Sequence, residues 1–266
     1  MDPAALLDFF GLSTGEAERL FLVVVRLSGL FLAAPFFSRA GGAGPLRIRV
    51  VLILALAVVL FPLVPPWSHE GHSNAPQMAW AALIELSIGA VLGMLIHWGL
   101  AAVQIAGNII GFEMGLSMAQ VMDPTSGMQE NVLSNMLYMA AMLIFLTIDG
   151  HHMLLEGMAR SFQILPPGGA GLHRELLLEN AVTALMRMFL LSLLIAAPVI
   201  VASKLLYIGM GLVNRAAPQI QVFFLAMPLT QMVGFAVLGT SMALFGQVLV
   251  REINAFVILT FRMIGV

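Results

Sequence analysis

Six apolar stretches occupy most of this chain and limit what it can fold into. A helix that crosses the hydrocarbon core of a bilayer needs about 20 largely apolar residues. Charged residues make up 10% of the 266 residues, against about a quarter in soluble domains, so charge is too scarce to cover a globule of this size. We therefore expect an all-α membrane protein with about six long hydrophobic helical tracts. The tracts are Phe21–Phe37, Val50–Val64, Met78–Val103, Val132–Ile148, Leu176–Val201 and Ile220–Val250.

The connections between these stretches differ in charge. Ser38–Arg49 contains three arginines and no acid, whereas Trp67–Gln77 contains neither lysine nor arginine. Basic connections stay in the cytoplasm, so the first is predicted to be cytoplasmic and the second external. Ser203–Gln219, with Lys204 and Arg215, is predicted to be a further cytoplasmic connection. The acidic N-terminus lacks the basic start of a secretory signal, which predicts that the first stretch is retained.

Gln104–Gln129 differs from the other apolar segments. Its glycines 107, 111 and 115 and its methionines 114, 118 and 122 each recur at every fourth position, which places each set on one helical stripe. Glycine allows close approach of another backbone, and methionine adapts to irregular surroundings. We interpret the segment as a re-entrant or pore-facing element with a turn at Asp123–Gly127.

Four charged residues lie within or beside apolar stretches, namely Arg26, Glu85, Glu113 and Arg187. Exposing such a charge at the bilayer centre costs about 2.5–3.5 kcal/mol on insertion scales, so each should face protein or water. They can form structural ion pairs between helices, lie near span ends, or line an ion pathway. We prefer the structural interpretation because the acids lie in different stretches, whereas a relay usually needs several acids in one span.

Catalytic and ligand-binding signals are weak. Asp149-Gly150-His151-His152, followed by Glu156, suggests a metal site, but the spacing does not match the zincin pattern, and we prefer a polar span end. The chain has no cysteine, which excludes disulfides and thiol catalysis. It contains no Walker loop, Rossmann fingerprint or serine nucleophile motif. We therefore predict no enzyme activity, no cofactor, no metal and, with a net charge of −2, no nucleic-acid partner.

Several segments, in order along nearly the whole chain, carry a resemblance to a known family. They are Arg26–Pro35 with the arginines that follow it, Gly111–Ser117, Asp123–Gly127, Asp149–His152, Ser161–Gly168 and Asn214–Phe224. Together these segments are similar to the FliR/SctT family, whose flagellar members are membrane components of the type III protein export gate. FliR serves flagella and SctT serves virulence injectisomes, and the forms Gly-His-His and Arg-Ala-Ala-Pro-Gln look more flagellar.

The resemblance implies a FliP-like helical part over residues 1–175, with a plug loop at 106–128. A FliQ-like helical hairpin with an amphipathic C-terminal tail would follow over 176–266, turning at Asn214–Gln219. It implies assembly with FliP-like and FliQ-like subunits, alongside FlhA-like and FlhB-like export components, in the flagellar basal body of the bacterial inner membrane. The plug would comprise Ile110, Gly111, Phe112, Glu113, Met114, Gly115, Leu116 and Met118, with Arg26, Glu85 and Arg187 as charges between helices or subunits.

The function expected from this resemblance is to form part of a channel for unfolded flagellar proteins. Three alternatives remain open: a virulence-type export gate subunit, an ion-coupled secondary transporter using Glu85, Glu113 and Arg187, and an intramembrane metalloenzyme using His151, His152 and Glu156.

Overall fold

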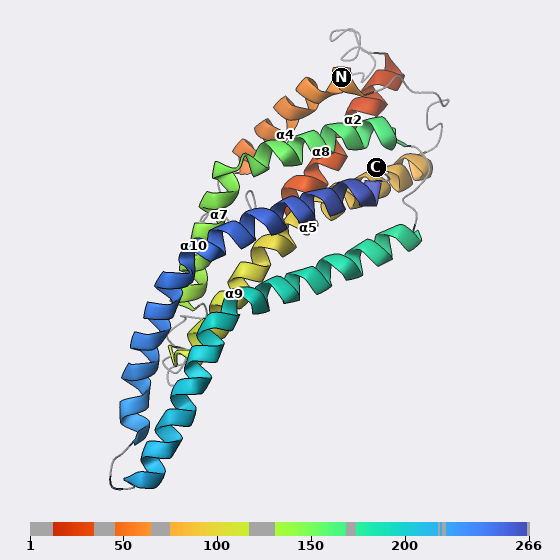
Figure 1. Cartoon of the computed structure of the whole chain (residues 1–266). Coiled ribbons are helices and arrows are strands. Elements are labelled where there is room, and N and C mark those ends of the chain that lie inside the picture. Colours follow the sequence, from red (N-terminus) through yellow and green to blue (C-terminus); the bar gives the residue numbers. More distant parts are fainter. Residues whose placement is uncertain are drawn as a thin grey trace. The chain divides into compact units, whose positions relative to one another are not determined.

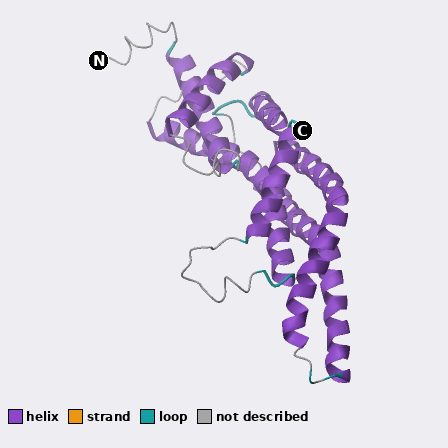
Figure 2. Cartoon of the chain, turned by 90° about the vertical axis from the view of Figure 1, so that its left-hand side faces the viewer, coloured by secondary structure: helices purple, strands orange, loops and turns teal. Residues whose placement is uncertain are grey.

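The computed structural model describes residues 13–34, 46–64, 75–116, 131–168, 174–217, 219 and 222–264. Within these residues all regular secondary structure is helical (Figure 2). The helices, labelled in Figure 1, are α2 (Thr14–Ala33), α4 (Leu46–Leu60) with the 3-10 turn η1 (Phe61–Leu63), α5 (Ala75–Glu113), α7 (Val132–Thr147), α8 (Gly150–Ile164), α9 (Arg174–Ala216) and α10 (Val222–Ile264).

Three helices are long and apolar enough to cross a membrane: α5, α9 from Glu179 and α10 over Phe224–Leu259. The pair α7 and α8, bent by 64°, makes a fourth if the two count as one broken span. The expected all-helical membrane protein is thus confirmed, whereas six membrane-length tracts are not. Apolar α4 is too short, and α2 carries Glu16, Glu18, Arg19 and Arg26 within its 20 residues.

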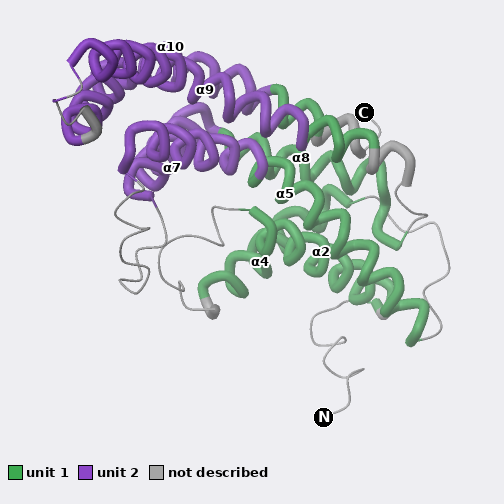
Figure 3. The backbone as a smooth tube through the Cα atoms, turned by 90° about the horizontal axis from the view of Figure 1, so that it is seen from below, with its two compact units in different colours: residues 1–97, 150–184, 255–266 green, residues 98–149, 185–254 purple. Residues whose placement is uncertain are grey.

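The chain divides into two compact units, each assembled from segments that are distant in the sequence (Figure 3). One unit contains residues 1–97, 150–184 and 255–266, and the other contains residues 98–149 and 185–254. The first is built from α2, α4, the first part of α5, α8, the start of α9 and the end of α10. The second contains the end of α5, α7, and the parts of α9 and α10 that lie side by side next to their connecting turn (Figures 1 and 2).

A capping box starts α2. The hydroxyl of Ser13 accepts a hydrogen bond from the Glu16 amide at 3.3 Å, and the Ser13 amide donates to the Glu16 carboxylate at 2.8 Å. The hydrogen bonds that the amide and hydroxyl of Ser13 donate lower the pKa of Glu16. Because this reciprocal pair satisfies donors that a helix start leaves free, it fixes where α2 begins.

Glycines allow α2 and α5 to pack with their backbones in contact. A Cβ atom on Gly89 of α5 would overlap the carbonyl oxygen of Arg26, and one on Gly93 would lie 2.8 Å from the carbonyl oxygen of Leu30. From the other side, a Cβ on Gly29 of α2 would overlap the carbonyl oxygen of Leu86. Glycines four residues apart let apolar helices approach closely and gain dispersion energy. This contact brings the middle of α2 against the part of α5 that contains Glu85.

The segment predicted to be re-entrant is helical at its start. α5 continues to Glu113, so Gln104–Glu113 forms its C-terminal end and not a separate element. Two glycines of the stripe pack against α7 and its N-cap: a Cβ on Gly107 would lie 2.5 Å from the Cα of Ser134, and one on Gly111 would overlap the Asn131 side chain. The remaining part of the prediction, with Met118, Met122 and the turn at Asp123–Gly127, lies outside the described residues.

The predicted connection Ser203–Gln219 is also mostly helical. α9 ends at Ala216 and α10 begins at Val222, so Asn214–Ala216 of the expected turn belong to α9 and the connection between the helices covers residues 217–221. The apolar residues on both sides of Lys204 continue the helix, and Gly209 and Gly211 are tolerated within it. Lys204 therefore lies on a helix and can have a defined partner.

Substituting Gly89 by alanine is expected to destabilise the packing of α2 on α5. The added methyl group forces two backbones apart, and overpacking of this kind costs about 1–3 kcal/mol. The measurement is the thermal unfolding midpoint of the protein extracted in mild detergent. Gly209→Ala is the matched control, because a Cβ there meets nothing within 4 Å and alanine favours the helix. Equal midpoints for the two variants would contradict the close contact.

Candidate functional site

An enclosed ion pair joins α2 to α5. The side chains of Arg26 and Glu85 are buried, at 0% and 1% exposure. Arg26 donates from Nε to Oε2 of Glu85 and from Nη2 to Oε1, the latter at 3.0 Å. Such two-point contacts between a guanidinium and a carboxylate are the strongest side-chain pairs, and they make burial of both charges tolerable.

Other groups complete the hydrogen bonding of this pair. Arg26 donates to the hydroxyl of Ser161 at 3.1 Å and to the carbonyl oxygen of Leu165 at 2.9 Å, and its guanidinium lies 4.5 Å from the ring centre of Phe162. The amide of Gly168, whose φ is 74°, donates to Glu85 at 3.1 Å. The pair therefore ties α2 and α5 to α8 and to the turn after α8. This arrangement favours the structural interpretation of Arg26 and Glu85.

The structure places Arg187 elsewhere, on α9 in the second unit. Its Nη1 lies 3.9 Å from Oε2 of Glu252 on α10, and its side chain is 43% exposed. Arg251 approaches the same carboxylate at 3.3 Å. Exposed pairs of this kind contribute little stability. Glu252 did not stand out in the sequence, because nothing in the local pattern of α10 links it to α9.

The end of α5 is a helix stop built on Gly115. Its φ is 73°, a left-handed conformation that glycine adopts without strain. The Leu116 amide donates to the carbonyl oxygen of Gly111 at 2.9 Å, and the Gly115 amide donates to that of Phe112 at 3.0 Å. These two bonds define a Schellman motif, which satisfies carbonyls left free at a helix end. The last turn of α5 therefore has a fixed geometry.

The predicted plug residues fall into two groups. Ile110, Gly111 and Met114 are buried in the second unit, and the side chain of Met114 occupies the space that a Cβ on Gly234 of α10 would need. Phe112 is 74% exposed, and Leu116 is partly exposed. Met118 lies outside the described residues. The structure thus leaves Phe112 as the large apolar side chain that projects from the end of α5.

Two residues of α9 bind this helix end. Nζ of Lys204 lies 2.9 Å from each carboxylate oxygen of Glu113. The hydroxyl of Tyr207, one helical turn further along, donates to the backbone carbonyl oxygen of Glu113 at 3.4 Å. Sequence reasoning missed both partners, because it placed Lys204 in a connection. The available signal was the spacing of a lysine and a tyrosine by three residues, which puts both on one helical face.

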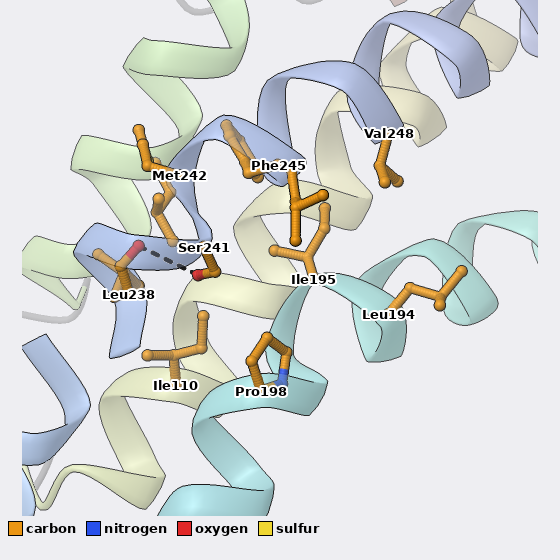
Figure 4. Close-up of a pocket in the computed structure, with 11 residues that line it drawn as sticks. Ile110, Leu194, Ile195, Pro198, Leu238, Ser241, Met242, Phe245 and Val248 are labelled. Atoms are coloured by element: carbon orange, nitrogen blue, oxygen red, sulfur yellow. Dashed lines mark hydrogen bonds between the residues drawn. The ribbon is translucent and has the colours of Figure 1, made fainter. Parts of the chain in front are cut away.

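An apolar cavity of about 220 Å³ lies nearby in the same unit (Figure 4). Ile110 of α5, Pro198 of α9 and Ser241 of α10 line it from different helices. The Ser241 hydroxyl donates a hydrogen bond to the carbonyl oxygen of Leu238 at 3.0 Å. Pro198 has no amide hydrogen, so the carbonyl oxygen of Leu194, which also lines the cavity, lacks its helical donor. This pocket, which is partly open to the surroundings, therefore lies beside an interruption in the hydrogen bonding of α9.

The histidines predicted to mark a polar span end lie at the start of α8. The ring centres of His151 and His152 are 4.3 Å apart. Glu156, the third residue of the metalloenzyme alternative, instead pairs with Arg160 at 2.7 Å. This pairing gives the carboxylate of Glu156 a partner other than a metal ion.

The structural interpretation of the enclosed pair makes a prediction about single and double substitutions. Arg26→Leu or Glu85→Leu alone leaves an unpaired buried charge and should cost about 3–5 kcal/mol, measured as lost folded yield and a lower unfolding midpoint. The double variant Arg26→Leu with Glu85→Leu should recover much of that stability. A double variant with an unfolding midpoint as low as that of the single variants would contradict the structural interpretation.

The sequence of the chain is similar to known proteins of one family. The family described as bacterial export proteins, family 1, matches residues 17–256. The flagellar biosynthetic protein FliR of Escherichia coli K12 is 34% identical over 228 residues, covering 84% of each chain. FliR of Bacillus subtilis 168 is 32% identical over 91% of this chain and 92% of its own. The surface presentation of antigens protein SpaR of Salmonella typhimurium is 26% identical over 80% of this chain and 78% of its own. The chain therefore belongs to family 1 of the bacterial export proteins, the FliR/SctT family.

Proposed function

We propose that this chain is a membrane subunit of the flagellar type III protein export gate and forms part of the channel for unfolded flagellar proteins. Support comes from the relatives named for flagellar biosynthesis, which align over most of the chain. The virulence-type gate is the alternative within the family, and the lower identity to SpaR favours the flagellar system. The subunit has no catalytic role in this proposal.

Assembly with other membrane subunits is the second part of the proposal. Large apolar side chains on α9 and α10 are exposed in the single chain, among them Phe189, Leu193, Leu205, Phe224, Met232 and Leu244. In the bacterial inner membrane, lipid and FliP-like and FliQ-like subunits would cover them, next to FlhA-like and FlhB-like components. Residues 1–175 would be the FliP-like part. The long helices α9 and α10, joined by a short turn, would provide the FliQ-like hairpin of residues 176–266.

The end of α5 is the proposed plug. The observation that carries this proposal is the exposure of Phe112 beside two buried neighbours, Ile110 and Met114. A fixed helix end with one large apolar side chain pointing outward can close a narrow conduit, because an apolar constriction excludes water and ions. Weak and non-directional contacts of that kind also allow an unfolded chain to displace the side chain. Ile110 and Met114 then anchor the plug, while Phe112 and Leu116 seal.

The pairing of the acids argues against the transporter alternative. Glu85 is enclosed with Arg26, and Glu113 is bound by Lys204. A coupled transporter needs acids that exchange protons or ions with an aqueous pathway. These two carboxylates are instead occupied by basic partners, and they lie in different structural units.

Shortening Phe112 should make the assembled gate leak ions. In the complex with its partners, Phe112→Ala is expected to raise the resting membrane conductance with little change in assembly, and replacing residues 112–118 by a Gly/Ser linker should raise it further. Phe235→Ala, which shortens another exposed aromatic side chain, on α10, is the control and should stay near wild type. Met114→Ala should lower the free energy of unfolding by about 2–5 kcal/mol, because it leaves a cavity in the core. The yield of folded protein should fall accordingly.

Wild-type conductance in both Phe112→Ala and the linker variant, at equal amounts of assembled complex, would refute the plug.

A further inference from the structure

We infer that Lys204 and Tyr207 are positioning residues that form a releasable latch on the end of α5 and hold Phe112 in its sealing position. This inference rests on the proposed function. The latch is defined as the contacts of these two residues with Glu113, through the carboxylate at 2.9 Å and through the backbone carbonyl oxygen at 3.4 Å.

The position of Glu113 explains why the helix end needs a cation. Glu113 is the last helical residue of α5, where the helix dipole already concentrates negative charge. A carboxylate at this position is unfavourable unless a basic group lies beside it. Lys204 contacts both carboxylate oxygens, so it neutralises the side chain and the helix end together. Without Lys204, the last turn of α5 would carry an uncompensated negative charge.

Tyr207 acts on the backbone of the same residue. The last four carbonyl groups of a helix have no partner within the helix, and the Schellman bonds satisfy those of Gly111 and Phe112. The Tyr207 hydroxyl binds the carbonyl oxygen of Glu113, the next in line. Since Phe112 directly precedes Glu113, fixing the side chain and the carbonyl group of Glu113 also fixes the backbone from which the Phe112 side chain projects.

The exposure of the latch makes it releasable. The Lys204 side chain is 58% exposed and that of Glu113 is 13% exposed, whereas both members of the Arg26–Glu85 pair are enclosed. Partly exposed pairs are weak enough to break and re-form. The enclosed pair cannot open without leaving buried charges, so it is suited to permanent structure. A seal that must yield to a passing chain needs a partly exposed pair such as that of Lys204 and Glu113.

Lys204 and Tyr207 lie on α9 just after a proline that interrupts its hydrogen bonding. Pro198 lies six residues before Lys204 and removes a backbone hydrogen bond from the α9 ladder. The apolar cavity of about 220 Å³ lies beside it, so this side of α9 meets less packing resistance. A change of direction at Pro198 would move Lys204 and Tyr207 away from Glu113 while the first part of α9 stays in place.

The test compares charge reversal with charge exchange in the complete membrane complex. Lys204→Glu or Glu113→Lys alone places like charges together and should raise resting conductance several-fold per assembled complex. The exchanged double variant restores an ion pair and should return conductance close to wild type. Tyr207→Phe should give a smaller increase. Arg251→Glu, which reverses another exposed basic residue of the same unit, is the control and should not leak.

Recovery of wild-type conductance in the exchanged double variant would distinguish a latch from a general structural role. A general structural role predicts that the single variants fail to assemble, whereas a latch predicts that they assemble and leak. If the reversals fail to assemble, Lys204→Met with normal conductance overturns the inference, and raised conductance supports it. Single variants at wild-type conductance, or a double variant as leaky as the singles, also overturn it. Leakage in Phe112→Ala but not in the latch variants rejects the latch and keeps the proposed function. Absence of leakage in both rejects the seal itself.

Discussion

The buried Arg26–Glu85 pair is the constraint around which the first unit is organised. A guanidinium and a carboxylate can be enclosed in an apolar protein when nearly every donor and acceptor has a partner. Here the partners come from Ser161 and from the turn containing Leu165 and Gly168, more than 70 residues beyond Glu85 in the sequence. The glycine contact of α2 with α5 brings the two charges together, so helix packing and charge pairing depend on each other.

The second unit uses its charges differently. Lys204 and Glu113 meet at the end of a helix, where the pair remains partly open to its surroundings. The same helix end contains buried Ile110 and Met114 and exposed Phe112. One short segment thus combines an anchor, a projecting apolar side chain and a contact that can be broken. Charges are costly in an apolar chain. One unit encloses them in the buried Arg26–Glu85 pair, whereas the other holds them in the partly exposed Lys204–Glu113 pair.

The sequence predicted the helices well and their partners poorly. The apolar stretches overlap α2, α4, α5, α7, α9 and α10, but three or four of the described helices, and not six, are long and apolar enough to cross a membrane. The end of α5 was misjudged, because the glycines and polar residues of 104–113 suggested irregular backbone, although in the structure they serve close packing on α7. The partners Lys204, Tyr207 and Glu252 were not predictable. Each contact joins segments many residues apart, and no local pattern reveals which faces meet.

In the proposed gate, Phe112 faces a sealed aqueous conduit and not lipid. The chain contains no cysteine, so Phe112→Cys introduces a single thiol without further changes. In the assembled complex, its rate of modification by a small water-soluble thiol reagent should rise when the seal is weakened by Lys204→Glu and fall when a stalled substrate fills the channel. Met139→Cys, on the exposed face of α7, serves as reference. Modification of Phe112→Cys by lipid-soluble reagents alone, unaffected by substrate, would contradict the account.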